Sequence, residues 1–335
     1  MIGRTGVATD STSSARREWA RENLSRLAVE AFGLFAFYLA VVLFFSIRAE
    51  QFLSYSNAIN ILSNVSVIGI VSIGQALTLI SGGFDLSVSG TVPLGAVSYA
   101  LLTNSGVSIP LAILLVLGIG MAVGLVNGLL ITKVGINPLI ATLGTLSITG
   151  GLARTVTKGL TKSFEYPEAG FLADSTIGRI PNHVWALLGL ALLSSLMLRY
   201  TVFGRSIYAI GGNREASRLA GLRVDALTVS VYMICGMLAA FAGIVVASQL
   251  LAGSATLGAN SALTSIAAVV LGGASLAGGR GGIPGTLVGV LILGTLANGL
   301  ALLAVPAFYQ EIATGVVLLL AVGMGRLRAL FGAEE

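Results

Sequence analysis

Few side chains in this chain could take part in catalysis. His183 and Cys235 are its single histidine and its single cysteine, so neither a disulfide framework nor a histidine–cysteine metal site is expected. Serines are plentiful, but none lies in a G-x-S-x-G elbow, and no lysine lies in a G-x-x-x-x-G-K-[ST] phosphate loop. We therefore expect no catalytic residue, metal or cofactor on this chain, and any ATP that drives it must be hydrolysed by another subunit.

The polar segment 203–224 is the strongest candidate for a functional surface, because it is rich in arginine and lies between long apolar runs. A glycine pair interrupts the preceding structure, an asparagine follows as a favourable N-cap, and a glutamate lies in the first turn, where its charge suits the helix dipole. Small apolar side chains then recur at helical spacing among arginines, and a glycine can end the helix. These residues are Gly211, Gly212, Asn213, Arg214, Glu215, Ala216, Arg218, Leu219, Ala220 and Gly221.

Two interpretations of this short amphipathic helix stand side by side when the segment is taken alone. It could dock into a groove on a partner protein, as amphipathic helices commonly do. It could instead be a topology signal whose arginines rest on lipid headgroups, because basic residues beside membrane spans gather on the cytoplasmic side. In both interpretations the segment faces the cytoplasm.

Composition places the chain in a membrane. Apolar residues make up 55% of it and charged residues only 10%, against about 25% charged in ordinary soluble domains. Several apolar runs reach the ~20 residues that a helix needs to cross the hydrocarbon core, and they lack the alternation of barrel strands. We predict an all-α polytopic membrane protein with about ten transmembrane helices. The expected spans are residues 28–47, 58–81, 86–104, 109–132, 138–157, 183–202, 226–251, 262–278, 284–304 and 308–325.

The distribution of basic residues sets the orientation. With both termini in the cytoplasm, 14 of the 19 lysines and arginines lie inside and five outside, which is the asymmetry of the positive-inside rule. This gives a cytoplasmic N-terminal tail over 1–27, a transmembrane domain over 28–325 and a cytoplasmic C-terminal tail over 326–335. The domain has a cytoplasmic loop at 203–224 and an outer loop at 158–182. The expected location is the inner (plasma) membrane, as a multi-pass protein.

Three long motifs lie far apart in the chain: SGGFDLSVSG at 81–90, YAIGGNREASRLAGLRV at 208–224 and IAAVVLGGASLAGGRGGIPGTLVG at 266–289. In this order and spacing they resemble the signature segments of ABC importer permeases of the ribose, arabinose and xylose type. The resemblance covers roughly residues 50–325. It implies a permease subunit that moves a monosaccharide or a similar small polar solute inward.

The same resemblance implies partners and assigns a role to the polar segment. The partners would be a second permease subunit, identical or homologous, two cytoplasmic ATP-binding subunits that hold ATP and Mg, and an extracytoplasmic solute-binding protein. Residues 213–222 would be the coupling helix that sits in a groove of the ATP-binding subunit. A nucleic-acid partner is not expected, because membrane topology accounts for the basic residues.

Polar side chains inside the apolar runs are candidates for lining a passage. Uncharged amides and hydroxyls suit a neutral polyhydroxylated cargo, whereas an ion pathway usually has buried charges. Such groups also bond their own helix backbone or hold neighbouring helices together, and for each residue taken singly this structural role is the stronger expectation. The candidates are Asn60, Asn64, Gln75, Asn127, Thr142, Thr145 and Asn298.

Glycine recurs every fourth residue in the fourth expected span, at Gly120, Gly124 and Gly128. Such a ridge lets two helix backbones approach closely in lipid. We therefore predict a helix-packing surface there. A cargo pathway lined by backbone carbonyls is the weaker alternative.

Charged residues in two loops carry further predictions. Asp85 is expected to cap the third span, with a functional carboxylate near the membrane as the alternative. Arg280, in a matching glycine-rich break, could pair with Asp85 at the cytoplasmic face. Lys158, Lys162 and Arg179 in the outer loop could orient a docking binding protein by charge, with a solvated loop as the alternative.

One function from another class also fits part of the sequence. An ion- or proton-coupled secondary transporter of a neutral polar solute would need no ATP-binding partner. The scarcity of acidic residues within the expected spans argues against it, because ion and proton pathways depend on such groups.

Overall fold

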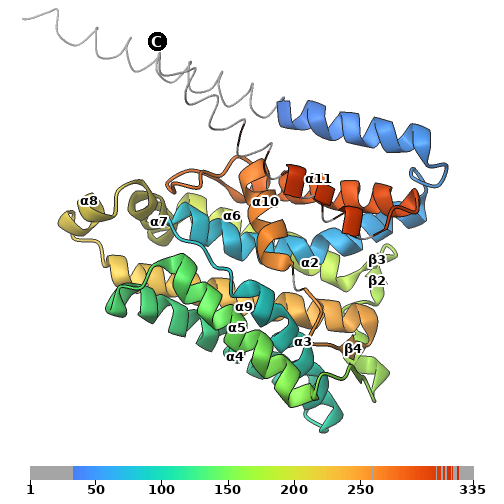
Figure 1. Ribbon diagram of the computed structural model, residues 1–335, viewed down its shortest axis with the longest axis horizontal. Coiled ribbons are helices and arrows are strands. Elements are labelled where there is room, and N and C mark those ends of the chain that lie inside the picture. The colour runs from blue at the N-terminus through green and yellow to red at the C-terminus, as the bar shows by residue number, and fades with distance from the viewer. Residues whose placement is uncertain are drawn as a thin grey trace, which may run out of the picture.

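A computed structural model describes residues 33–306, except Ala259, and scattered positions between 308 and 323. The predicted tails at 1–27 and 326–335, and parts of the first and last expected spans, lie outside the described residues. The described chain is a bundle of long helices with α8 at one extremity and short strands towards the other (Figure 1). The helices are Gly33–Arg48, α2 (Tyr55–Ile80), α3 (Val88–Asn104), α4 (Ile109–Leu129), α5 (Pro138–Thr157), α6 (Asn182–Tyr200), α7 (Val202–Gly212), α8 (Arg214–Leu219), α9 (Val224–Leu250), α10 (Ser261–Leu271) and α11 (Ile283–Leu302).

Six of the described helices are long and apolar enough to cross a membrane. They are α2, α4 with the π-helical turn Leu130–Val134 that continues it, α5, α6, α9 and α11. α3 has 17 residues, which is about 26 Å at the usual rise per residue and slightly less than the hydrocarbon thickness. The predicted class, an all-helical polytopic membrane protein, is confirmed.

The span predicted at residues 262–278 is wrong. α10 has only 11 residues, so it is about 16 Å long and cannot cross a bilayer by itself. The chain beyond it turns repeatedly, with positive φ at Gly273, Gly278 and Gly279, a conformation that a helix cannot contain. The chain before it, from Ala252 to Asn260, is also non-helical where it is described. In place of the expected span, the chain therefore has a short helix, α10, preceded by an irregular segment.

The centre of the bundle is α9, against which α2, α3 and α4 all pack. The glycines predicted as a packing ridge lie on this contact: a Cβ on Gly120 or Gly124 would overlap backbone oxygens of α9, and one on Gly128 would lie 2.7 Å from the Val229 Cα. The packing interpretation is confirmed. Such close backbone approach replaces the hydrophobic driving force that helices in lipid lack.

Short strands gather at the end of the bundle opposite α8. β1 (Lys162–Ser163) pairs antiparallel with β4 (Ala252–Gly253), and β2 (Ser175–Ile177) pairs with β3 (Ile180–Pro181). A short 3-10 turn, Pro167–Gly170, lies between β1 and β2. We call this part of the molecule the β end. The opposite part, formed by α7, α8 and the chain segments that contact them, is the α8 end.

Candidate functional site

α8 forms as its sequence dictates. The Asn213 side-chain oxygen accepts a hydrogen bond from the Ala216 N–H at 2.9 Å, which is the predicted N-cap. Glu215 lies in the first turn. The helix ends where Gly221 takes a φ of 84° and the Leu222 N–H reaches back to the Ser217 carbonyl at 3.1 Å, as in a Schellman cap.

The surface of α8 is almost entirely open. Ser217 is its single buried residue, whereas Leu219 is 82% exposed and Ala216 and Ala220 are exposed beside it. The small apolar face predicted from the sequence therefore points away from the chain to which it belongs. An exposed apolar face on a short polar helix has the form of a docking surface for a partner.

Basic side chains surround one carboxylate beside α8. Asp225 forms ion pairs with Lys133 at 3.1 Å, Arg218 at 3.5 Å and Arg214 at 3.7 Å. Because three cations share one carboxylate, the cluster is positive overall. All four side chains are partly or largely exposed, so the pairs contribute little stability and leave the arginines able to meet an acidic partner.

At the end of α7, just before α8, glycine backbones from three distant segments meet. A Cβ on Gly211 would overlap the carbonyl oxygen of Ile80, and a Cβ on Gly278 would lie 2.8 Å from both the Gly211 oxygen and the Gly82 Cα. The Gly279 N–H donates to the Ile80 carbonyl at 2.9 Å. We call this contact of residues 80–82, 211 and 278–279 the glycine junction. It connects the end of α7 to the end of α2 and to the α10–α11 loop.

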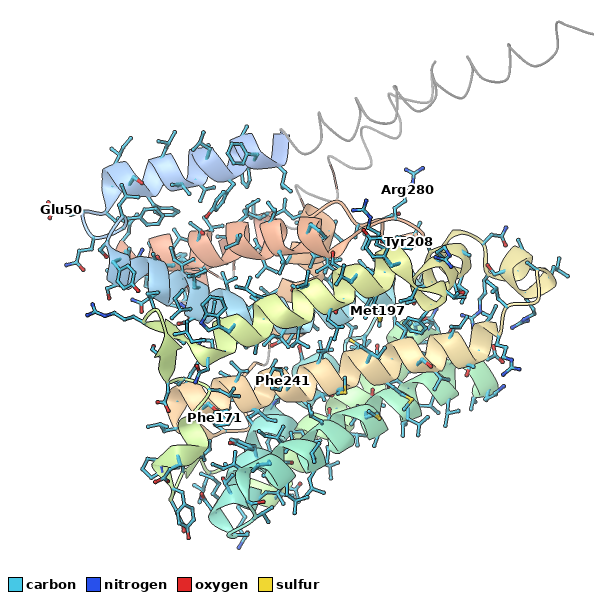
Figure 2. The ribbon with its side chains drawn as sticks, turned by 180° about the vertical axis from the view of Figure 1, so that it is seen from behind. Glu50, Phe171, Met197, Tyr208, Phe241 and Arg280 are labelled. Carbon is cyan, nitrogen blue, oxygen red and sulfur yellow. The ribbon has the colours of Figure 1, made fainter. Side chains whose placement is uncertain are left out.

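Tyr208 adds a side-chain contact to the glycine junction. Its hydroxyl donates to the Gly281 carbonyl at 2.8 Å, and burial raises its pKa above the ordinary value, so the donor keeps its proton. Figure 2 shows Tyr208 and Arg280 at the same end of the bundle, with Arg280 pointing away from it. Gly212, which the sequence grouped with Gly211, has no atom within 4 Å of an added Cβ. Only the first glycine of that pair is needed for contact.

The predicted pairing of Asp85 with Arg280 is wrong. Asp85 is fully buried, whereas Arg280 is exposed, and among the described residues neither belongs to an ion pair. Asp85 is also not the N-cap of α3, because Ser87 occupies that position. One Asp85 oxygen instead accepts from the backbone N–H of Ser87 at 3.0 Å and from its hydroxyl. The carboxylate thus fixes the turn that precedes α3.

A buried polar network continues from this turn into α4 and α5. The Asn127 amide donates to the Ser87 hydroxyl at 2.8 Å, and the Thr145 hydroxyl donates to the Asn127 side-chain oxygen at 2.7 Å. Thr142, also buried, donates to the Pro138 carbonyl of its own helix at 2.8 Å. All three passage candidates are therefore engaged inside the bundle. Asn127 and Thr145 link neighbouring helices, whereas Thr142 bonds the backbone of its own helix.

The remaining passage candidates differ in exposure. Asn60 and Asn64 on α2 are exposed, and Asn298 on α11 is half-buried. Gln75 on α2 is fully buried, and neither its amide nitrogen nor its amide oxygen has a hydrogen-bond partner among the described residues.

The outer-loop candidates lie at the β end on a well-anchored loop. Lys158 and Arg179 are exposed, and Lys162 is half-buried in β1 opposite Gly253. The loop is held by the Tyr99 hydroxyl, which donates to the Ala169 carbonyl at 2.9 Å, and by the Phe164 N–H, which donates to the Leu251 carbonyl at 2.8 Å. The basic side chains therefore project from a fixed surface.

Comparison with known proteins gives consistent relatives. The family model described as "Branched-chain amino acid transport system / permease component" matches residues 57–322. The ribose import permease protein RbsC of Escherichia coli is 38% identical over 94% of this chain and 98% of its own length, and that of Bacillus subtilis is 39% identical over 90% and 94%. The L-arabinose ABC transporter permease protein AraH of Azospirillum brasilense is 36% identical over 87% and 86%. No solved structure matches the chain.

Proposed function

The chain belongs to the family of transport-system permease components, and we propose that it is the membrane subunit of an ABC importer that carries a monosaccharide or a similar small polar solute into the cell. Relatives named for ribose and for L-arabinose import support a sugar as cargo. The uncharged polar side chains on α2 suit such a cargo, because hydroxyl groups are recognised by amide donors and acceptors.

We propose that the chain crosses the inner membrane ten times and that both of its termini lie in the cytoplasm. Beyond the six long helices, the crossings would be the helix at Gly33–Arg48, α3, the segment 252–271 with its half-helix, and the apolar run at 308–325. The cluster of Lys133, Arg214 and Arg218 supports a cytoplasmic α8 end, by the positive-inside rule. The β end then faces the outside.

The observation that carries the coupling role is the glycine junction beneath an exposed α8. Two ATP-binding subunits, which would hold ATP and Mg, bind α8 of each permease copy through the open face of Ala216, Leu219 and Ala220 and the surrounding arginines. Movement of these subunits shifts α8, and the backbone contacts of Gly211 pass the shift to α2 and to the α10–α11 loop. The chain itself supplies no nucleotide site.

The outer partner is an extracytoplasmic solute-binding protein that docks on the β end. Lys158, Lys162 and Arg179 orient it by complementary charge. A second permease copy, identical or homologous, completes the passage in the surrounding lipid.

Reconstitution tests the proposal. Vesicles are prepared with the permease and its ATP-binding subunits in the membrane and the binding protein outside. They are expected to accumulate labelled ribose or arabinose only when ATP is present on the inner side, which α8 faces. Omitting the ATP-binding subunits should abolish uptake. Uptake that instead follows an ion or proton gradient without those subunits would establish the secondary transporter and refute the proposal.

A further inference from the structure

The crossing that ends in α10 leaves the outer half of one side of α2 uncovered. The irregular segment 252–260 that precedes α10 runs along α3. Gly253 lies against Ala96 and Ala100, and Gly258 lies against Val92. At the start of α10 the Ala262 N–H donates to the Ser89 hydroxyl near the first turn of α3, at 2.9 Å. α10 then packs against α2 and α11 and ends at Leu271. Only the half of α2 nearer α8 is therefore covered by it.

The contacts of α2 show which of its sides meets α10. Gly74 faces Cys235 of α9, Gly69 faces Leu187 of α6, and Val65 faces Gly294 of α11. Because each residue advances a helix by about 100°, Gln75 projects between the directions of α9 and α11. Figures 1 and 2, seen from opposite sides, place α10 and α6 on opposite faces of α2. α10 packs against both α2 and α11, and we infer that it lies on the side of α2 towards which Gln75 projects.

Amides follow this side of α2 from end to end, but their environments differ. Asn64 lies 11 residues before Gln75, which is close to three helical turns, so both side chains point in nearly the same direction. Asn64 and its neighbour Asn60 are exposed, whereas Gln75 is fully buried and lies in the half of α2 against which α10 packs. The amide series is thus open at its outer end and covered at its inner end.

The burial of the Gln75 amide costs folding free energy. Both of its amide atoms are buried without a hydrogen-bond partner among the described residues, although an amide can donate twice and accept twice. A leucine or methionine would fill the same space without this penalty. A buried group left unsatisfied in one state is explained if another state gives it a partner.

We propose that Gln75 is a gated cargo-binding residue and that α10 is the gate that covers it. The inference rests on the proposed function. When α10 moves away from α2, the Gln75 amide faces the passage and exchanges hydrogen bonds with hydroxyl groups of a sugar arriving past Asn60 and Asn64. The glycine junction transmits the movement of α7 and α8 to the α10–α11 loop, because Gly279 is hydrogen-bonded to Ile80 of α2 and lies next to Gly211 of α7.

Transport by matched variants in the complete complex tests the binding role. Gln75→Met keeps the length of the side chain and removes the amide. We expect uptake of ribose or arabinose to fall at least tenfold, with thermal stability of the complex unchanged or raised. Ser66→Ala is the control, because Ser66 is fully buried on the opposite side of α2 and bonds the Ser63 carbonyl of its own helix. It is expected to transport like the unmodified chain.

Accessibility tests the gate independently of any loss of folding. Gln75→Cys in the complete complex should react with a small maleimide when ATP and the loaded binding protein are present, and should be protected without nucleotide. Normal transport by Gln75→Met, or a cysteine at 75 that is never or always labelled, would overturn the inference. If the unmodified complex shows no ATP-driven uptake, the proposed function itself has failed, and that result is distinguishable from both.

Discussion

The α8 end and the β end hold their segments together in different ways. At the α8 end, the glycine junction brings backbones of three segments into direct contact, with no side chain between them. At the β end, the loop is tied by side chains such as Tyr99 and Asn104 and by two-residue strand pairs. Direct backbone contact at the glycine junction transmits displacement. At the β end, side-chain hydrogen bonds add to the backbone pairing, and each of them can be lost singly. The α8 end is therefore suited to transmitting movement, and the β end to presenting an anchored docking surface.

The largest expected effect comes from filling the glycine junction. In Gly211→Ala the new Cβ would overlap the Ile80 carbonyl, so α7 and α2 must separate. We expect ATP-driven uptake to fall about tenfold or more, since strain of about 1.4 kcal/mol already changes an equilibrium tenfold. Gly212→Ala is the matched control, with no atom within 4 Å of its Cβ, and should be active. Equal losses in both variants would refute the role of the junction.

A smaller effect is expected from removing the α8 cap. Asn213→Ala loses the hydrogen bond to the Ala216 N–H, which costs about 1 kcal/mol of helix stability. The affinity of the solubilised permease for its ATP-binding subunits should fall about fivefold. Asn213→Asp retains an N-cap acceptor and should bind nearly normally. If the alanine variant binds as tightly as the unmodified chain, α8 is not the docking element.

Charge reversal at the β end should weaken association with the binding protein more than it lowers the maximal rate of uptake. Replacing Lys158, Lys162 and Arg179 by glutamate is expected to raise the concentration of binding protein that gives half-maximal uptake about threefold, with a maximal rate close to normal. The difference should shrink at high salt, because exposed charges are screened. An unchanged half-maximal concentration at low salt would count against docking at this surface.

The smallest effect should follow the loss of one tie at the β end. Tyr99→Phe removes the hydrogen bond to the Ala169 carbonyl, worth about 1 kcal/mol, while strand pairing and the Phe164 contacts persist. Uptake should change less than twofold, with a small decrease in thermal stability. A loss as large as that of Gly211→Ala would remove the contrast between the two ends.

Local features of this fold could be predicted from sequence, and long-range ones could not. The cap at Asn213 and the packing ridge of α4 depend on residue type and spacing, and both were predicted. The end of α10 at Leu271 was missed because hydropathy over 262–278 does not record that Gly273, Gly278 and Gly279 adopt positive φ. The N-cap of α3 was predicted at Asp85, two residues before its position at Ser87. Asp85 instead accepts hydrogen bonds from Ser87, which also belongs to a network with α4 and α5 that sequence spacing does not reveal.

The signal for the glycine junction was present in the sequence but incomplete. Glycine pairs at 82–83, 211–212 and 278–279 mark three breaks, yet only the fold brings them together. Within each pair, sequence alone does not tell which glycine makes the contact, as Gly211 and Gly212 illustrate. The burial of Gln75 likewise depends on where α10 ends.

The central claim is that movement of α8 reaches α10 through the glycine junction, and one distance measurement tests it most directly. Spin labels on Leu276, exposed in the α10–α11 loop, and on Ile148, exposed on α5, report this movement within one chain of the complete complex. We predict that adding ATP changes the distance between the labels in the unmodified chain and leaves it constant in Gly211→Ala. A distance that ignores ATP in the unmodified, transporting complex, or that changes equally in the variant, would contradict the account.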